Sequence, residues 1–416
     1  MHSEHFAHPA VVLGLGQNGL ATVRALARQG VPVIGVDANM KQPTAHTRLC
    51  RKVVCTDFRG EGLLHCLLDL GRTLPVKGVL FPSGDISLDL VSERREVLSN
   101  YYEIILPEKE VMRLVLNKKA FYHFARQHGF LIPNTYFPRD ESEVAELSHD
   151  VRYPCILKPF QPDAAWRRKF PDVKVFEVSS AQELLSHYRT LSQLHPEFLI
   201  QEVIPGPDSA LAFSLTFFDG QQALGMFTGR KLRQFPPFYG TSCLAESRWY
   251  PWVAEETLRL LKALGFQGYG SVEFKWDPRD ECFKIIELTP RTWFPHGLST
   301  ACGINLPYLM YRYVLGLPVD APQGFVEGLK WIHEERDILS ALRMWRQGQL
   351  SLRDWLSSYH GRRTYALAAW DDPGPLRAAM LRLCKRPLSF LRPRKKPTAG
   401  GPLQASATKI PERKSA

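Results

Sequence analysis

The sequence predicts an α/β protein in which a parallel sheet comes first and a larger α+β region follows. Over the first hundred residues, short apolar runs alternate with helix-like stretches, an order typical of βαβ units. From about Glu108 the pattern changes to two consecutive helices and then a β-rich half, in which turn sequences such as Asp219-Gly220 separate the strands. A length of 416 residues fits two or three domains.

In the N-terminal region, four apolar runs predict strands and two stretches between them predict helices. The strands are expected at residues 10–15, 31–36, 79–81 and 104–106, and the helices at 19–29 and 85–97. The turn Gly14–Gly19 matches G-x-G-x-x-G after the first strand, and Asp37 ends the second strand. Such a turn binds dinucleotides in this setting, but it also occurs in Rossmann-like domains that bind none. An NAD-dependent oxidoreductase is therefore one alternative.

The second region is predicted to contain more strands than helices. The strands are expected at 155–158, 173–178, 198–204, 210–218, 223–228, 271–275 and 282–288, and the helices at 108–116, 118–128, 181–194 and 304–315. Residues 321–384 are predicted to be a short helical extension, with helices at 338–346 and 376–383. Residues 385–416 are rich in Pro, Lys, Arg, Gly and Ser without periodicity, and we expect them to be disordered.

The composition excludes several classes of protein. A content of 44% hydrophobic and 23% charged residues is that of a globular protein. The eight cysteines include no Cys-x-x-Cys pair, so we expect reduced thiols rather than disulfides or structural zinc. No run approaches the roughly 18 apolar residues of a membrane-spanning helix, and the N-terminus has no signal-peptide pattern. These features predict a cytoplasmic protein.

The net charge of +11 is concentrated in the tail. The last 32 residues hold nine basic residues and one acidic residue, so they carry +8, and the remainder of the chain carries only +3. Because the body is nearly neutral, we do not expect nucleic acid to be the partner. The tail and the basic stretch 376–390 before it could contact an anionic membrane surface or an acidic partner, although a solvated tail is an equal alternative.

The most informative stretch is a predicted hairpin that carries two glutamates. Its turn centres near residues 279–280, so Glu273 is expected to face Ile286 or Glu287 across the strands. Two adjacent carboxylates on an otherwise apolar hairpin repel each other unless a cation lies between them. Mg²⁺, held by one or two carboxylates and by substrate phosphates, would meet that need. The alternative is that one glutamate points outward or pairs with a nearby Lys or Arg.

At these residues the sequence resembles the ATP-grasp ligases, whose second carboxylate strand ends in Glu-x-Asn-Pro-Arg. Four further motifs extend the resemblance. They are the Asn-Lys that opens a helix at 117–118, the strand 153–159 with its Lys-Pro end, the hinge-like run 201–208, and the run 229–236, which is closest to a D-aspartate-ligase-like subgroup of predicted carboxylate–amine ligases.

The resemblance covers roughly residues 10–320 and implies a domain organisation and an activity. A Rossmann-like pre-ATP-grasp domain, usually without NAD, would span residues 1–107, and a two-lobed ATP-grasp domain would span 108–320. The helical extension 321–384 and the tail 385–416 would follow. The implied activity is ATP- and Mg²⁺-dependent activation of a small carboxylate as an acyl phosphate, which an amine then attacks to form an amide-like bond. In similar enzymes the first domain often mediates a homodimer.

The resemblance also implies a role for individual residues. The implied set comprises Lys118 and Lys158 on the phosphates, Gln201, Glu202, Val203 and Ile204 on the adenine, Asp208 on the ribose, Glu273, Glu287 and Thr289 on Mg²⁺, and Lys231 and Arg291 on the transferring phosphoryl group or the acyl phosphate.

Several departures from the family pattern leave alternatives open. Thr289 replaces the family asparagine, and its hydroxyl is a poorer and shorter metal ligand, so a catalytically weakened ATP-binding module is one alternative. A carbamoyl-phosphate-synthase-like carboligase that uses bicarbonate is another. Lys231 has basic neighbours and could belong to a solvated cluster. The loop 161–174 contains no glycine, unlike many phosphate lids, and could still close over triphosphate. His296 either lines the acceptor pocket or is a satisfied loop histidine.

Overall fold

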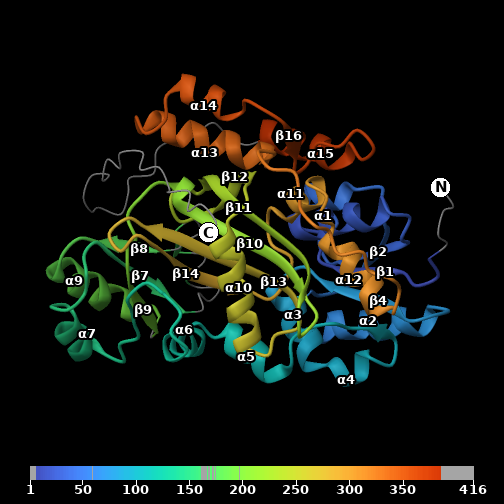
Figure 1. The fold of residues 1–416 in the computed structure, drawn as a ribbon, viewed down its shortest axis with the longest axis horizontal. Helices are drawn as coiled ribbons and strands as arrows, with labels where there is room; N and C mark the ends of the chain where they lie inside the picture. Colours follow the sequence, from blue (N-terminus) through green and yellow to red (C-terminus); the bar gives the residue numbers. More distant parts are fainter. Residues whose placement is uncertain are drawn as a thin grey trace.

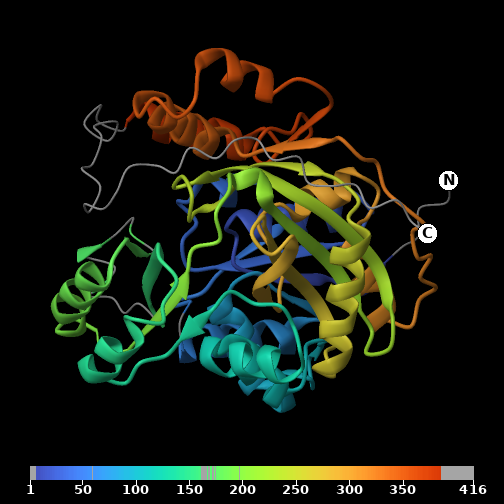
Figure 2. The same cartoon turned by 60° about the vertical axis from the view of Figure 1, so that its left-hand side comes forward.

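The computed structural model describes residues 6–385, apart from residues 59, 161–165, 167–168, 171–172, 174 and 196. Within this part of the chain the strands form three sheets, with five, four and seven strands. Figure 1 shows the N-terminal sheet in blue at one end, a small green lobe at the other, and the large sheet between them. The turned view in Figure 2 shows the C-terminal helices together on one side of the molecule, above the large sheet.

The N-terminal sheet is parallel, as predicted, with the order β3-β2-β1-β4-β5. Its strands are β1 (Ala10–Leu13), β2 (Val33–Asp37), β3 (Arg51–Val54), β4 (Gly78–Pro82) and β5 (Tyr102–Glu103), and the surrounding helices are α1 (Gln17–Ala27), η1 (Pro43–His46), α2 (Glu61–Thr73), α3 (Asp85–Glu93) and α4 (Arg95–Leu98). The strand predicted at 104–106 is wrong, because Ile105 and Leu106 are apolar through burial in the core and not through strand pairing.

The small lobe is built on the antiparallel sheet β6-β9-β7-β8. The lobe consists of β6 (Thr135–Tyr136), α7 (Glu141–Leu147), β7 (Cys155–Pro159), β8 (Phe176–Val178), α9 (Ala181–Ser192) and β9 (Phe198–Glu202), and α5 (Lys109–Leu116) and α6 (Lys118–Gln127) lead into it. It has its own apolar core, in which the inward faces of the strands pack on α9. The predicted lid loop 161–174 lies for the most part outside the described residues.

The large sheet has the order β14-β13-β10-β11-β12-β15-β16. Its elements are η2 (Asp208–Ala210), β10 (Leu211–Phe218), β11 (Ala223–Phe235), β12 (Thr241–Ser247), α10 (Pro251–Ala263), β13 (Gly268–Asp277), β14 (Cys282–Thr289), α11 (His296–Ala301) and α12 (Leu306–Val314). Every residue of β10 is buried, because α10 packs on one face of the sheet and α11 and α12 pack on the other. The sequence analysis did not predict β12, α10 and α11.

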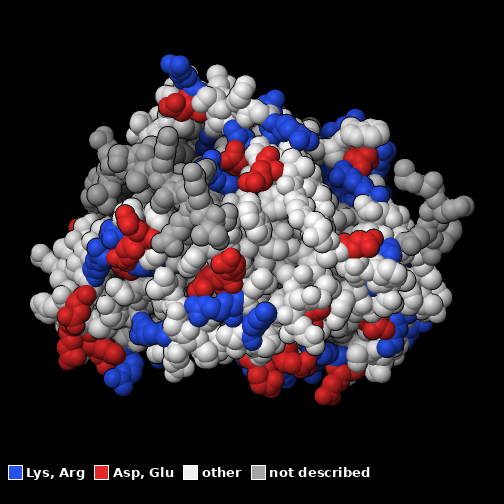
Figure 3. All heavy atoms as spheres, viewed as in Figure 1, with Lys and Arg blue, Asp and Glu red and all other residues white. Residues whose placement is uncertain are grey.

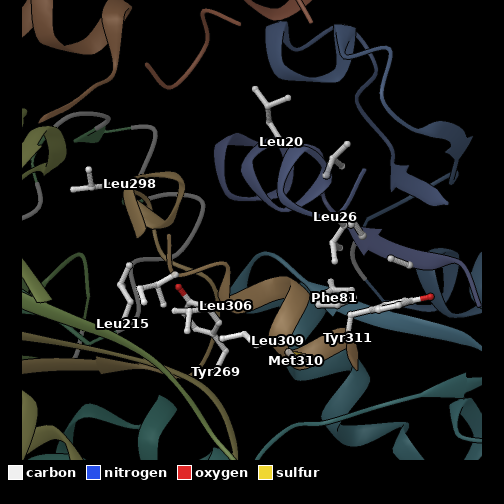
Figure 4. Close-up of a cluster of buried hydrophobic side chains, with 14 of the residues drawn as sticks. Leu20, Leu26, Phe81, Leu215, Tyr269, Leu298, Leu306, Leu309, Met310 and Tyr311 are labelled. Atoms are coloured by element: carbon white, nitrogen blue, oxygen red, sulfur yellow. The ribbon is translucent and has the colours of Figure 1, made fainter. Parts of the chain in front are cut away.

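One apolar cluster joins the N-terminal sheet to the large sheet. Figure 4 shows Phe81 beside Tyr311 of α12, Leu20 and Leu26 on α1 above them, and Leu215 and Tyr269 of the large sheet on the other side of α12. Because these side chains form a single core that includes Leu15 and Tyr269, the turn after β1 and the strand β13 are held in a fixed relation. The domain boundaries predicted from the sequence stay predictions.

The C-terminal extension contains strands as well as helices. It consists of β15 (Lys330–Ile332), α13 (Glu334–Arg346), α14 (Leu352–Ser358), β16 (Arg363–Tyr365) and α15 (Gly374–Cys384). β15 pairs with β12, so the extension covers an edge of the large sheet that would otherwise be unpaired. The predicted helices at 338–346 and 376–383 are confirmed. Apart from Lys385, the predicted disordered tail lies outside the described residues. No described helix is long and apolar enough to cross a membrane.

The glycine-rich turn gives a sharp test of the packing at α1. A Cβ at Gly19 would lie 1.8 Å from the carbonyl oxygen of Gly14, whereas a Cβ at Gly16 would have no atom within 4 Å. We therefore expect Gly19→Ala to lower the free energy of unfolding by about 2–3 kcal/mol, because the backbone must move. Gly16→Ala is the matched control and should cost less than about 1 kcal/mol. Equal midpoints of urea unfolding for the two variants would contradict this packing.

Candidate active site

A cavity of about 1140 Å³ lies where the three sheets approach one another. Its walls come from α6, the small lobe, the large sheet and the loop before α3. Eleven of the twelve predicted site residues line it, namely Lys118, Lys158, Gln201, Glu202, Val203, Ile204, Lys231, Glu273, Glu287, Thr289 and Arg291. Asp208 is the exception. The two predicted residues that lie farthest apart in the sequence, Lys118 and Arg291, are separated by 173 positions and share this cavity.

The two glutamates of the predicted hairpin face each other. Glu273 of β13 pairs with Glu287 of β14, and the register then shifts, so that Phe274 pairs with Ile285. Of the two partners predicted for Glu273, the structure has Glu287. The side chains are 17% and 51% exposed, respectively. Among the described residues no group of three or more His, Cys, Asp or Glu is placed to hold a metal, so a cation at this pair would need further ligands.

Lys231 reaches the same pair from the neighbouring part of the sheet. Its Nζ lies 2.5 Å from a carboxylate oxygen of Glu273 and donates to the side-chain oxygen of Gln234 at 3.3 Å. The ammonium also lies 5.1 Å from the centre of the Trp293 ring. Lys231 is only 2% exposed, and a buried lysine needs such partners because desolvation penalises its charge. The alternative of a solvated basic cluster is therefore wrong.

The basic neighbours of Lys231 point elsewhere. Arg230 forms an ion pair with Glu246 at 2.6 Å, and Arg233 forms one with Asp337 at 2.7 Å. Neither arginine lines the cavity. Of the three adjacent cations, only Lys231 can therefore meet a ligand in it.

The remaining predicted cations approach from three elements. Lys118 is the first residue of α6, and its Nζ lies 3.9 Å from Glu287. Lys158 lies on β7 and is half-buried. Arg291 follows β14, and its Nε is 2.6 Å from a carboxylate oxygen of Asp85, the first residue of α3. This ion pair ties the glutamate-bearing strand to the N-terminal region, a contact that local sequence patterns cannot predict.

The hinge-like run 201–204 is fixed mainly through the side chain of Glu202. That carboxylate accepts hydrogen bonds from the Asn134 N–H at 3.0 Å, from Lys284 at 3.1 Å and from Arg279 at 3.0 Å. The Val203 N–H donates to a backbone carbonyl, whereas the Ile204 N–H has no acceptor among the described residues. The backbone after β9 is thus positioned to meet a ligand, while the Glu202 side chain is occupied.

A buried ionic network supports this hinge. Asp277 accepts from Arg279 at 2.6 Å and from Lys284 at 2.9 Å. Burial alone would raise the pKa of Asp277, but the hydrogen bonds from these two cations hold the pKa well below its ordinary value. Both cations also contact Glu202. The hairpin that carries Glu273 and Glu287 is therefore joined to the hinge by charge-assisted bonds.

The Gln201 side chain also has a structural task. Its amide donates to the Tyr122 hydroxyl at 2.9 Å and to Thr135 at 2.8 Å, and Tyr122 donates to the carbonyl of Ile286 at 2.6 Å. Burial raises the pKa of Tyr122, which keeps its proton in place for that bond. A chain of three hydrogen bonds thus joins β6, α6 and β14 beneath the cavity.

Asp208 supports the cavity wall without lining it. Its two carboxylate oxygens accept from the backbone N–H of Gln234 at 3.0 Å and from the side-chain amide of Gln234 at 2.8 Å. Burial raises the pKa of Asp208, and the hydrogen bonds from Gln234 and the charge of Lys231 oppose that rise. The ribose role of Asp208 stays a prediction, but both oxygens are already engaged.

Lys275 is a cavity residue that the sequence analysis did not select. It lies two positions after Glu273 on β13, so the alternation of a strand places both side chains on the same face. Burial lowers the pKa of Lys275, and the nearby charges of Asp208 and Glu273 oppose the shift. The signal was present in the sequence, since the residues at alternate positions from Glu273 are all charged up to Asp277.

The carboxylate of Asp37 forms hydrogen bonds within the glycine-rich turn and with the residues that follow β2. The Asp37 carboxylate accepts hydrogen bonds from the Leu15 N–H at 2.6 Å, the Asn39 N–H at 2.8 Å and the Gln42 amide at 2.7 Å. Asn18, in the same turn, donates to the carbonyl of Thr292 at 3.0 Å, beside Arg291. The turn therefore packs α1 against the residues that follow β14, and the acid that would bind a dinucleotide ribose instead closes the turn.

His296 is a satisfied, fully buried residue at the start of α11. Its Nδ1 contacts the carbonyl of Trp293 at 2.8 Å, and its Nε2 contacts the Thr22 hydroxyl at 3.3 Å. It does not line the cavity. Burial lowers the pKa of His296 to about 4, because the apolar surroundings penalise the charged ring. Of the two alternatives given above, the satisfied histidine is the one found, although it lies on a helix and not in a loop.

The lowered pKa of His296 predicts a pH dependence of stability. The unfolded chain takes up a proton at this residue below about pH 6.5, whereas the folded chain does so only near pH 4. The free energy of unfolding should therefore fall as the pH drops from 6.5 to 4, by an amount on the order of 3 kcal/mol for this residue. Urea titrations of the wild type and of His296→Gln should show the difference, and equal slopes with pH would contradict the assignment.

Comparisons with known proteins agree with this architecture. No known family model matches the chain. It is 23% identical over 239 residues to D-aspartate ligase of Enterococcus faecium, which covers 55% of this chain and 57% of that protein. The match therefore spans little more than half the length of this relative.

Solved structures give matches of greater extent. A complex of biotin carboxylase with a β,γ-ATP ligand from Campylobacter jejuni matches with a TM-score of 0.61 and 15% identity, covering 77% of this chain and 74% of that one. The L-amino acid ligase of Bacillus licheniformis matches with a TM-score of 0.56 and 18% identity, covering 74% of each chain. The chain thus has the ATP-grasp fold, with the parallel N-terminal sheet and the antiparallel sheets that the sequence analysis expected.

Proposed function

We propose that the protein is an ATP- and Mg²⁺-dependent ligase that joins a carboxylate to an amine. The observation that carries the proposal is the pair Glu273 and Glu287, which face each other on the wall of one cavity with Lys231 in contact with Glu273. Lys118, Lys158 and Arg291 line the same cavity. Two acids among several cations suit a magnesium–triphosphate group, which carries both kinds of charge.

In this proposal the chain binds ATP at the adenine and at the triphosphate. The backbone of residues 201–204 would accept and donate hydrogen bonds at the adenine edge, with the Ile204 N–H as donor. Lys118 and Lys158 would neutralise phosphate oxygens as point charges. Lys231 and Arg291 would stabilise the charge on the transferring group. Supporting evidence comes from the biotin carboxylase neighbour, whose complex contains an ATP ligand.

Glu273 and Glu287 would hold Mg²⁺, with Thr289 as a third and weaker ligand. The donor set fits this ion, because both side chains are hard oxygen donors. Among the described residues no third acid is grouped with them, which leaves coordination positions for phosphate oxygens. When bound, the ion would neutralise charge on the phosphates. The chain's own cations, Lys231 and Arg291, would act on the same oxygens.

The reaction needs no nucleophile from the protein. An oxygen of the substrate carboxylate attacks the γ-phosphorus, the bond from that phosphorus to the bridging oxygen breaks, and ADP leaves. The amine nitrogen then attacks the acyl carbon, the bond from carbon to the phosphate oxygen breaks, and the nitrogen gives its proton to solvent. The work of the chain is therefore positioning and charge neutralisation.

A bicarbonate-dependent carboligase is the second candidate, favoured by the structural likeness to biotin carboxylase. The L-amino acid ligase neighbour and the D-aspartate ligase relative favour the first. The engaged carboxylate of Asp37 weighs against an NAD-dependent oxidoreductase. The replacement at Thr289 is the one argument for a weakened binding module.

We further propose a cytoplasmic location and small-molecule substrates. All eight cysteines are free thiols, which suits a reducing compartment. On the face in Figure 3, basic and acidic side chains are interspersed, with no broad region of one sign, as expected for a body that does not bind nucleic acid. A homodimer through the N-terminal Rossmann-like domain is part of the same proposal.

The test is release of ADP and phosphate from ATP and Mg²⁺ with a panel of carboxylates, bicarbonate among them, and amines. The proposal predicts release that requires both an acid and an amine. Release with bicarbonate alone would support the carboligase, and tight ATP binding without release would support the binding module. Reduction of a nicotinamide cofactor without phosphate release would exclude a ligase.

A further inference from the structure

Strand β11 sends neighbouring side chains to opposite sides of the large sheet. Its pairing with β12 skips Leu232 on the first strand and Cys243 on the second. Lys231 and Gln234 consequently face the cavity, whereas Arg233 faces α13 of the C-terminal extension. Such bulges re-aim side chains beside functional sites, but they also weaken the ladder that would otherwise fix them.

The C-terminal extension binds this irregular segment of β11 through hydrogen bonds to Arg233. One guanidinium nitrogen donates to both carboxylate oxygens of Asp337, at 2.7 and 2.8 Å, and the other donates to Ser358 at 2.8 Å. Tyr359 also donates to Asp337. Arg233 is 3% exposed and Asp337 is fully buried. Because both terminal nitrogens of the guanidinium are bound, one to Asp337 and one to Ser358, the orientation of the group is fixed as well as its position.

A second contact lies one residue further along β11. The Ser340 hydroxyl of α13 donates to the backbone carbonyl of Gln234 at 2.5 Å. The side chain of Gln234 in turn contacts Lys231 and Asp208. Arg233 and Gln234, the two residues that follow the skipped Leu232, are thus both bound to α13. Lys231, which precedes Leu232, is linked to this segment through its contact with the Gln234 side chain.

We propose that α13 is a clamp on β11 and that Asp337, supported by Ser340, is a positioning residue for Lys231. The inference rests on the proposed function, in which Lys231 acts on the transferring group. A buried ion pair is a poor way to gain stability, because desolvation cancels much of its attraction and apolar residues often do as well. Its advantage here is geometric, since it holds the segment in the register that aims Lys231 at Glu273.

The test compares Asp337→Asn with a matched control, Asp372→Asn. Asp372 is also fully buried and pairs with a buried arginine, Arg24, at 3.0 Å, but it ties the extension to α1, away from the cavity. The clamp predicts that Asp337→Asn lowers kcat for ADP release at least about 10-fold with the KM for ATP within about 3-fold. Asp372→Asn should keep kcat within about 2-fold. Equal losses of kcat in the two variants would overturn the proposal.

A double-mutant cycle with Lys231 separates positioning from general damage. If Asp337 acts through Lys231, Asp337→Asn should change the residual rate of Lys231→Met by less than about 2-fold. If the loss of rate in the double variant instead equals the product of the losses in the two single variants, Asp337 acts independently of Lys231, and the clamp is overturned.

Hydrogen exchange gives a readout that does not depend on turnover. The clamp predicts faster amide exchange over residues 231–235 in Asp337→Asn than in the wild type and in Asp372→Asn, and unchanged exchange there would overturn it. If the wild type turns over no substrate pair, the proposed function fails while the exchange data still decide the clamp. If Asp337→Asn does not fold, Ser340→Ala, which removes only the hydrogen bond to Gln234, must show the same local increase.

Discussion

Replacing Glu287 by Gln is expected to reduce turnover at least about 1000-fold, because it removes one of the two carboxylates that face each other across β13 and β14. The amide keeps the size of the side chain but has no charge with which to hold a divalent cation. Glu287 is half exposed, so the fold should survive the change. Nucleotide binding measured without Mg²⁺ should remain within about 3-fold of the wild type.

Glu281→Gln is the matched control, because Glu281 lies at the exposed turn of the same hairpin and does not line the cavity. This variant should retain the wild-type rate of ADP release. An undiminished rate in Glu287→Gln would remove the metal assignment. If Glu281→Gln also fails to release ADP, the loss of activity in Glu287→Gln is explained by damage to the hairpin and not by loss of a metal ligand.

Replacing Lys231 by Met is expected to lower kcat by about 100- to 1000-fold, because the cation in contact with Glu273 would no longer reach the transferring group. Methionine keeps much of the apolar stem of the buried lysine and removes only the ammonium, which lies over the Trp293 ring. The KM for ATP should rise less than kcat falls, since the proposed role is in the transition state.

Arg230→Met is the control for this change, because Arg230 is the adjacent cation on β11 and pairs with Glu246 outside the cavity. It should keep kcat within about 3-fold of the wild type. Equal losses of kcat in the two variants would show that Lys231 has no role beyond that of the neighbouring basic residues of β11. Thermal unfolding of both variants would show whether a lost fold accounts for any loss of rate.

The sequence predicts those contacts in the cavity that depend only on residues close together in the chain. Glu273 and Glu287 could be brought together by counting across one hairpin, because cross-strand neighbours follow from the position of the turn. The bulge that follows, in which Ile286 is skipped and Phe274 pairs with Ile285, lies beyond that count, since the count assumes one residue opposite one along the whole hairpin. The parallel N-terminal sheet is likewise a local prediction, from strands separated by helices.

The sequence does not predict contacts between distant segments. Asp85 pairs with Arg291, 206 positions away, and nothing in either neighbourhood selects the other. The apolar run 104–106 was predicted to be a strand because burial and pairing leave the same signal. The ribose role implied for Asp208 took no account of Gln234, 26 positions away, which donates to both of its oxygens. The strands β15 and β16 were not predicted, because they form by pairing with the distant strand β12 and with each other and not from a local apolar run.

The central claim is that a substrate carboxylate attacks ATP to form an acyl phosphate. The most direct measurement uses a carboxylic acid that supports ADP release, labelled with ¹⁸O in its carboxylate, followed by mass analysis of the released phosphate. One ¹⁸O atom is expected in each released phosphate, because the carbon–oxygen bond breaks when the amine attacks. Unlabelled phosphate, released at the same rate as the product, would contradict that claim.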